Sequence, residues 1–196
     1  MKIQLIIFSL TILFSSNLFS QNKRTDWDSL KIHEAEYYKL EVPYEWRDFP
    51  AELYGFECYY IAEGLLLPPF YEEGPVIVRV FMTETEANSL EELKDSVVEG
   101  YDKNPDRVFE DDFEPQVEKY VLSSGEDTYL VSTKFFRKSK NLYQNRYDLV
   151  LYCDRHKKGY ILTLSIQHND GNYEIAKKWE FEDIAKKISK HFWWKP

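Results

Sequence analysis

Apolar and polar residues alternate along several segments of the chain, which is the pattern of half-buried β-strands. The clearest case is YDLVLYCD, in which Tyr147, Leu149, Leu151 and Cys153 share one face. The segment VIVRVFM has apolar residues on both faces, so we expect it at the centre of a sheet. The predicted strands are residues 37–42, 53–61, 76–82, 116–122, 128–137, 146–154 and 160–167.

The first predicted strand lies in YYKLEVPYEWRDFP, residues 37–50. Pro43 ends this strand because proline has no N–H group to donate to a neighbouring strand. Trp46 and Phe49 follow. A buried tryptophan is more often part of a core than of a ligand site, so we expect both side chains to pack beneath the sheet.

Two segments have helical periodicity. Ser89 and Glu92 form a capping box ahead of an apolar stripe made of Leu90, Leu93, Val97 and Tyr101. The second helix is expected over residues 172–192. Its apolar stripe consists of Phe181, Ile184, Ala185, Ile188 and Phe192.

Short turns join the strands of the second half, which predicts antiparallel pairing. The sequence therefore predicts an α+β fold, with an antiparallel sheet of about six or seven strands flanked by helices. A chain of 196 residues fits one domain after removal of a short leader. We expect a flexible lead-in over residues 21–34 and a single domain over residues 35–196.

The N-terminus reads MKIQLIIFSLTILFSSNLFS, with Lys2 ahead of an apolar run and small polar residues after it. This is the pattern of a secretory signal peptide, residues 1–20, cleaved after Ser20. The alternative is an uncleaved membrane anchor, but the run is short for a spanning helix. No cysteine lies near the cleavage point, so no lipid anchor is expected. We expect a periplasmic or secreted protein.

The formal net charge is −9, and no basic stripe offsets it. Such a chain repels phosphate backbones, which argues against nucleic-acid binding. Aromatic residues make up 17% of the sequence, led by 15 tyrosines, which suit a half-buried sheet surface. The composition gives no oligomeric state beyond a monomer or a weak oligomer.

The two cysteines, Cys58 and Cys153, both lie in predicted strands. In an oxidising compartment they form a candidate disulfide. The alternative is two buried free thiols in separate strands, since buried cysteine behaves as a small apolar residue.

The order of elements resembles the PsbP-like (Mog/PsbP/DcrB-like) superfamily. The resemblance rests on YYKLEVPYEW, on SLEELKDSVVEGY, and on RYDLVLYCDRHKKGYILTLSIQHND followed by FEDIAKKISKHFW. It covers residues 37–193. It implies a sheet flanked by helices, a binding, assembly or accessory role, and no shared catalytic residues.

The most unusual segment is GLLLPPFYEEGP, residues 64–75, an apolar loop rich in proline. If this loop is exposed, its apolar residues mark a partner surface. If it folds back over the sheet, it completes the core. The candidate partner surface consists of Leu65, Leu66, Leu67, Phe70 and Tyr71. The aromatic end, residues 192–194, could likewise be exposed or packed. We expect it to pack on the domain, with Trp194 the most exposed of the three residues.

Candidate chemistry is sparse. Residues 123–127, SSGED, favour a turn rather than a nucleophile. The acidic run at residues 110–114 lacks the ligand spacing of a calcium loop. His168-Asn169-Asp170 reads as a connection rather than a catalytic pair. The histidines show no metal-ligand spacing, and we expect no metal and no cofactor.

The sequence therefore favours an exported non-catalytic accessory or protein-binding domain with an unknown protein partner. Two alternatives remain. One is a secreted hydrolase acting on carbohydrate or cell-wall material through paired carboxylates. The other is a cargo chaperone that shields apolar segments.

Overall fold

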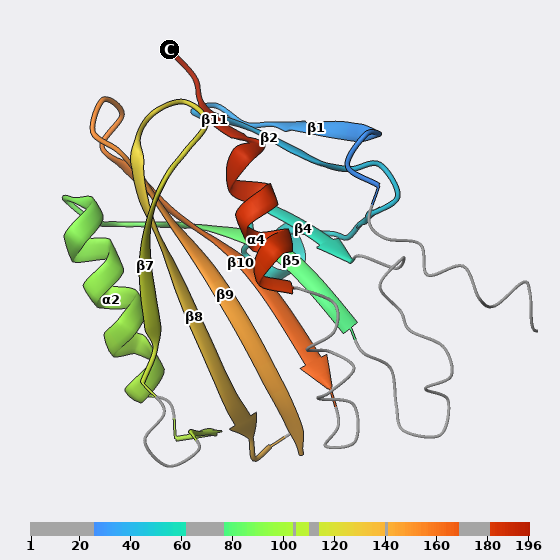
Figure 1. The fold of residues 1–196 in the computed structure, drawn as a ribbon, viewed down its shortest axis with the longest axis vertical. Helices are drawn as coiled ribbons and strands as arrows, with labels where there is room; N and C mark the ends of the chain where they lie inside the picture. Colours follow the sequence, from blue (N-terminus) through green and yellow to red (C-terminus); the bar gives the residue numbers. More distant parts are fainter. Residues whose placement is uncertain (1–25, 62–76, 104, 110–113, 140, 169–180) are drawn as a thin grey trace, which may run out of the picture.

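Two antiparallel sheets form the frame of the computed structural model, which describes residues 26–61, 77–103, 105–109, 114–139, 141–168 and 181–196. The larger sheet has the strand order β3-β4-β5-β10-β9-β8-β6, with β7 also paired to β8. The smaller sheet has the order β1-β2-β11 (Figure 1). The predicted α+β class is confirmed.

The strands are β1 (Leu30–Glu34), β2 (Tyr38–Pro43), β3 (Arg47–Asp48), β4 (Cys58–Ile61), β5 (Ile77–Thr85), β6 (Arg107–Val108), β7 (Gln116–Val121), β8 (Asp127–Arg137), β9 (Leu142–Cys153), β10 (Lys158–His168) and β11 (Phe192–Trp194). The helices are α2 (Leu90–Asp102), α4 (Phe181–Lys190) and the short 3-10 helix η1 (Glu52–Tyr54).

The central part of the larger sheet follows the predicted strands. β5 lies between β4 and β10, so its expected interior position is confirmed. The predicted strand over residues 53–61 is wrong in its first half. Gly55 adopts a left-handed conformation, with φ +70°, which ends η1 and interrupts the extended run before β4 begins.

The lead-in expected at residues 21–34 contains a strand that the sequence pattern did not reveal. β1 pairs with β2 along its whole length, from Leu30 opposite Pro43 to Glu34 opposite Lys39. Lys31 donates to the backbone carbonyl of Trp46 and pairs with Asp48 at 2.7 Å. A lysine with these partners occupies an inward position, so β1 shows no apolar alternation.

The C-terminal helix also ends earlier than predicted. α4 stops at Lys190, and the backbone N–H of His191 bonds to Ile188 in a turn. Phe192 then begins β11, opposite Leu40 of β2. Three consecutive aromatic residues favour a pleated strand over a helix. The expected helix start at residue 172 lies outside the described residues.

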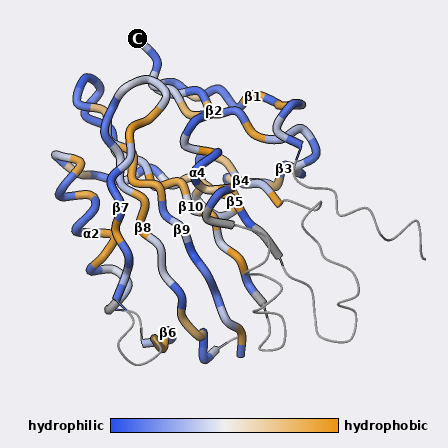
Figure 2. Tube along the Cα trace, viewed as in Figure 1, coloured by the Kyte–Doolittle hydropathy of each residue, from blue (hydrophilic) through white to orange (hydrophobic). Residues whose placement is uncertain are grey.

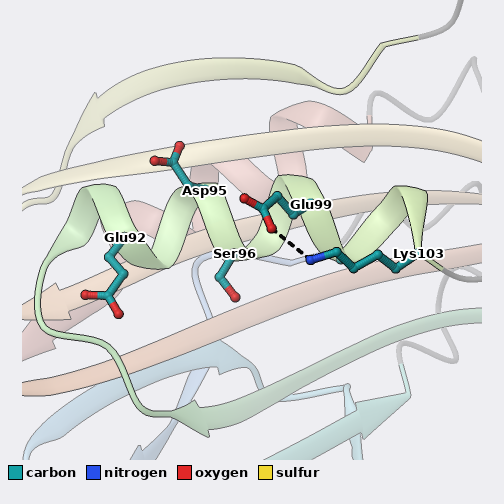
Figure 3. Close-up of a pocket in the computed structure, with 6 residues that line it drawn as sticks. Glu92, Asp95, Ser96, Glu99 and Lys103 are labelled. Carbon is teal, nitrogen blue, oxygen red and sulfur yellow. Dashed lines mark hydrogen bonds and ion pairs between the residues drawn. The ribbon is translucent and has the colours of Figure 1, made fainter.

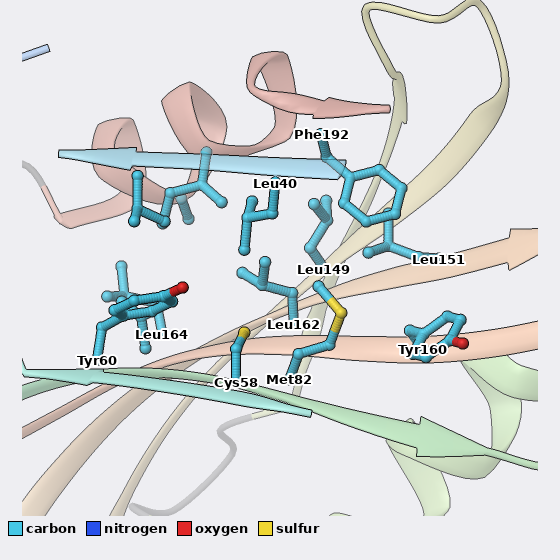
Figure 4. Packing of buried hydrophobic residues seen from close by; sticks show 14 of the residues in the cluster. Leu40, Cys58, Tyr60, Met82, Leu149, Leu151, Tyr160, Leu162, Leu164 and Phe192 are labelled. Atoms are coloured by element: carbon cyan, nitrogen blue, oxygen red, sulfur yellow. The ribbon is translucent and has the colours of Figure 1, made fainter. Parts of the chain in front are cut away.

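The main core lies between one face of the larger sheet and a cover made of α4 and the smaller sheet (Figure 4). Phe192 is fully buried there and Trp194 packs against it, as the sequence predicted for the aromatic end. Trp46 is also buried in this core, and its predicted packing role is confirmed. Each fully buried large apolar side chain contributes about 1.5–3 kcal/mol. The labelled members in Figure 4 are Leu40, Cys58, Tyr60, Met82, Leu149, Leu151, Tyr160, Leu162, Leu164 and Phe192.

A second core lies on the opposite face of the sheet, beneath α2. Its sheet members, Val131, Phe135 and Val150, alternate with main-core residues along β8 and β9. Alternate residues of a strand point to opposite faces, so α2 and α4 cover opposite faces. The tube of α2 alternates between polar and apolar residues in Figure 2. Its predicted stripe is confirmed, with Leu93, Val97 and Tyr101 buried.

The start of α2 is capped as predicted. Ser89 Oγ accepts a hydrogen bond from the backbone N–H of Glu92 at 3.1 Å. The Glu92 carboxylate accepts the backbone N–H of Asn88 at 3.1 Å, one residue earlier than a standard capping box. Among the described residues, no helix is long and apolar enough to cross a membrane.

Candidate functional site

The apolar loop that the sequence analysis singled out, Leu65 to Tyr71, lies outside the described residues, as do residues 110–113 of the acidic run. His168 ends β10, and Asn169 and Asp170 again lie outside. The SSGED segment is the predicted turn. Its backbone closes with Leu122 N–H bonded to Glu126 O at 2.8 Å, and Gly125 has φ +97°.

Cys58 and Cys153 do not form the candidate disulfide. Both are buried free thiols, which is the alternative that the sequence left open. Cys58 lies in β4 and Cys153 ends β9, with β5 and β10 between the two strands. Three strand spacings separate the cysteines by at least about 14 Å. A disulfide needs Cα atoms within about 7 Å.

A groove of about 1000 Å³ lies at one end of the larger sheet. Four segments that are distant in sequence line it. They are the start of α2 (residues 89–91), the β7–β8 turn (124–127), the β9–β10 turn (152–155) and the C-terminal residues 194–196. This volume is within the range of small-molecule sites, and the lining is mixed in polarity.

Most of the carboxylates that line the groove form ion pairs with lysine side chains. Glu126 differs, because one of its carboxylate oxygens is buried without a hydrogen-bond partner among the described residues, as is the indole N–H of Trp194. The paired acids are Glu91 with Lys94 at 2.9 Å, Asp127 with Lys119 at 2.6 Å, and Asp154 with Lys157 at 3.2 Å. Paired carboxylates of this kind favour a solvated rim over an acid–base pair.

The outer side of α2 carries a second hollow, of about 680 Å³ (Figure 3). Its labelled residues are charged or polar, and Glu99 pairs with Lys103 at 2.8 Å across one helical turn. An i,i+4 pair on an exposed helix is an ordinary surface feature. This hollow therefore has no feature that singles out a ligand.

Five rings gather where β3, η1, β4 and β5 meet, and we call this cluster the aromatic patch (Phe49, Tyr54, Phe56, Tyr59 and Phe81). Phe56 stacks on Phe81 with centroids 4.4 Å apart, and Tyr59 lies 5.1 Å from Phe49. Tyr54 closes the cluster, 5.6 Å from Tyr59. Such stacked and edge-to-face ring pairs stabilise their arrangement by about 0.5–1.5 kcal/mol each beyond the burial of their area.

The outer rim of the aromatic patch is exposed. Tyr54 is 55% exposed and Leu53, beside it in η1, is 79% exposed. Phe49, Phe56 and Phe81 are half-buried, and Tyr59 is buried. A preformed aromatic surface with exposed apolar groups at its rim is suited to contact another molecule.

A buried polar network lies next to the aromatic patch on the same sheet face. Arg146 pairs with Asp148 at 2.9 Å and donates to Thr163 at 3.1 Å. Tyr101 and Thr163 also donate to the Asp148 carboxylate. Burial raises the pKa of Tyr101, so its hydroxyl remains a donor. Burial opposes the charge of Arg146, but Asp148 offsets this and the pKa of Arg146 is raised.

Metal and acid–base chemistry receive no support from the described residues. No group of histidine, cysteine, aspartate and glutamate there has the arrangement of a metal site. The carboxyl groups with shifted pKa values shift downward, as at Glu91, which accepts a hydrogen bond from Tyr129 and pairs with Lys94. Asp106 shifts the same way because Ser139 donates to it. A general acid needs a raised pKa.

The sequence analysis did not identify the aromatic patch. Its members come from four short segments, and Tyr59 and Phe81 are adjacent only through the pairing of β4 with β5. Aromatic residues recur from Phe49 to Tyr59 and were a signal, but the sequence pattern predicted Phe49 beneath the sheet and residues 53–61 in a strand.

No family model matches the chain, and no curated protein matches it. Among solved structures, the chain is similar to the crystal structure of LpqN, which is described as involved in cell envelope biogenesis of Mycobacterium tuberculosis. The two share 13% sequence identity over 86% of this chain and 91% of that chain, with a TM-score of 0.48. A likeness at this level supports no functional inference. The relationship to the PsbP-like superfamily stays a prediction.

Proposed function

We propose that the protein is an exported, non-catalytic accessory domain that binds a protein partner through the aromatic patch and Leu53. The observation that supports this most is the exposure of Leu53 and Tyr54, at 79% and 55%, on the rim of the ring cluster. Tyrosine side chains are enriched among the residues that dominate binding energy at protein interfaces.

The position of the patch also suits partner binding. β4 ends at Ile61 and β5 begins at Ile77, and two of the five rings, Tyr59 of β4 and Phe81 of β5, lie on the strands that flank residues 62–76. That span contains the predicted partner surface, Leu65 to Tyr71.

Partner affinity in matched variants tests the binding proposal. The first step identifies a partner by chemical cross-linking in cells that express the chain, and affinity is then measured with both purified proteins. The variant Leu53→Ser/Tyr54→Ser should weaken binding at least about tenfold, since truncating interface anchors costs more than about 1 kcal/mol each.

The matched control is Val117→Ser/Val121→Ser on β7. These valines are 42% and 62% exposed and lie away from the patch. The control should bind as wild type does. Equal affinity of wild type and the patch variant would refute the proposed surface, and so would equal weakening by both variants.

Export is tested separately. The proposal expects the mature chain to begin at Gln21 and to be recovered outside the cytoplasm. Recovery of the full-length chain in the membrane fraction would contradict it and favour the uncleaved anchor.

A further inference from the structure

Arg79 and Arg146 lie on either side of Ser165 on the face that carries the aromatic patch. Ser165 of β10 is opposite Arg79 of β5 on one side and opposite Arg146 of β9 on the other. Neighbouring strands are about 4.8 Å apart, so the two arginine Cα atoms are about 10 Å apart.

The two arginines differ in their partners. Arg146 is satisfied by Asp148 and Thr163, and its guanidinium lies over the ring of Phe81, 6.0 Å from the centroid. Arg79 has no ion pair among the residues that the structure describes, and its Nε is buried without a hydrogen-bond partner. Two residues before Arg146 on β9, the Oε1 atom of Gln144 is also buried without a partner among the described residues, while its Nε2 donates to Ser165 at 2.7 Å.

An unpartnered buried guanidinium N–H is costly. Leaving a buried donor unpaired costs about 1–3 kcal/mol, and more when the group is charged. A guanidinium presents parallel donors that match the two oxygens of a carboxylate.

Arg79 is continuous with the aromatic patch. It lies two residues before Phe81 on β5, on the same face, and diagonally opposite Tyr59 of β4. The positive charge of Arg79 lowers the pKa of Tyr59, although burial raises it overall. A partner that covers the patch therefore comes within reach of Arg79.

We propose that Arg79 binds a carboxylate of the protein partner, either an acidic side chain or a chain terminus, while apolar groups of the partner cover the aromatic patch. This inference rests on the proposed function and names the chemistry of the partner. The charge of Arg146, two strands away on β9, adds to the attraction for the bound carboxylate.

The test uses the purified mature chain and acetate as the probe. The Nε–H signal of Arg79 is followed by NMR during an acetate titration, with chloride at equal ionic strength as the reference. The signal is assigned by its loss in Arg79→Lys, which keeps the positive charge. We expect a saturable shift with acetate and none with chloride.

Three controls decide the result. Arg155→Gln, on the exposed β9–β10 turn, should leave the response unchanged. A response equal in acetate and chloride would overturn the proposal. A shift of the Arg79 signal in Glu72→Gln/Glu73→Gln without acetate would also overturn it, because the carboxylate would then come from residues of this chain that lie outside the described ones.

The two proposals fail differently. A saturable acetate response together with unaltered partner affinity in Leu53→Ser/Tyr54→Ser would refute the proposed surface alone. A lost partner affinity in that variant with no acetate response would refute the role of Arg79 alone.

Discussion

Tyr101 of α2 donates its hydroxyl to the carboxylate of Asp148 in the middle of β9. Asp148 is fully buried and also accepts from Arg146 and Thr163. The contact joins the helix to the sheet by a polar bond, beside the apolar contacts of Leu93 and Val97. The guanidinium of Arg107 covers the same ring, 5.1 Å from its centroid.

The variant Tyr101→Phe removes one donor from a buried carboxylate and keeps the ring. It should lower the free energy of unfolding by about 1–3 kcal/mol, because Asp148 loses a partner that water does not replace. Urea denaturation measures the change. Tyr129→Phe is the matched control, since its hydroxyl bonds to the exposed Glu91, and its effect should stay within about 0.5 kcal/mol. Equal effects would contradict a buried role for the Tyr101 bond.

The cap of α2 makes a second prediction. Ser89→Ala removes the acceptor of the Glu92 N–H and should cost about 0.5–2 kcal/mol of unfolding free energy. Ser96→Ala, on the exposed side of the same helix, should be neutral or slightly stabilising, because alanine is the better helix former. A Ser96 effect as large as the Ser89 effect would show that helix propensity, not the cap, sets the result.

Much of the fold was predictable from local pattern. β5, β8, β9 and β10 have strong apolar periodicity, and α2 has both a cap and a stripe. β1 was not predictable, because Lys31 faces inward and bonds to Trp46, which removes the alternation. The end of α4 was misplaced for a related reason. Phe192 continues the helical stripe in sequence, yet it pairs with Leu40 in the smaller sheet.

The candidate site was less predictable than the fold. The aromatic patch depends on the pairing of β4 with β5, which a single sequence does not specify. The unpartnered state of Arg79 depends on which carboxylates lie near it in space. Leu65 to Tyr71, which the sequence did single out, lies outside the described residues.

The two cysteines give a chemical prediction. Burial raises the pKa of the Cys58 thiol to about 12, which suppresses the reactive thiolate at neutral pH. A thiol reagent should modify the native chain only slowly. A thiol assay on the denatured protein, without added reductant, should count two free thiols per chain. A count of zero in unreduced, denatured chain would establish a disulfide and contradict the strand arrangement.

His33 gives a pH prediction. Burial lowers its pKa below 6.5, against an opposing effect of Asp48. The unfolded chain therefore binds a proton near pH 6.5 that the folded chain does not, so the unfolding free energy falls as pH drops through 6.5 toward the folded pKa. His33→Gln should reduce the difference in unfolding free energy between mildly alkaline and mildly acidic buffer. An unchanged difference would show that another group titrates.

The central claim is that the aromatic patch and Leu53 contact a protein partner. The most direct measurement is site-specific photo-crosslinking in cells that express the chain. A photoreactive residue at Leu53 is compared with one at Val121, which is similarly exposed on β7. The account predicts a discrete protein adduct from position 53 and none from position 121. No adduct at position 53, or the same adducts at both positions, would contradict it.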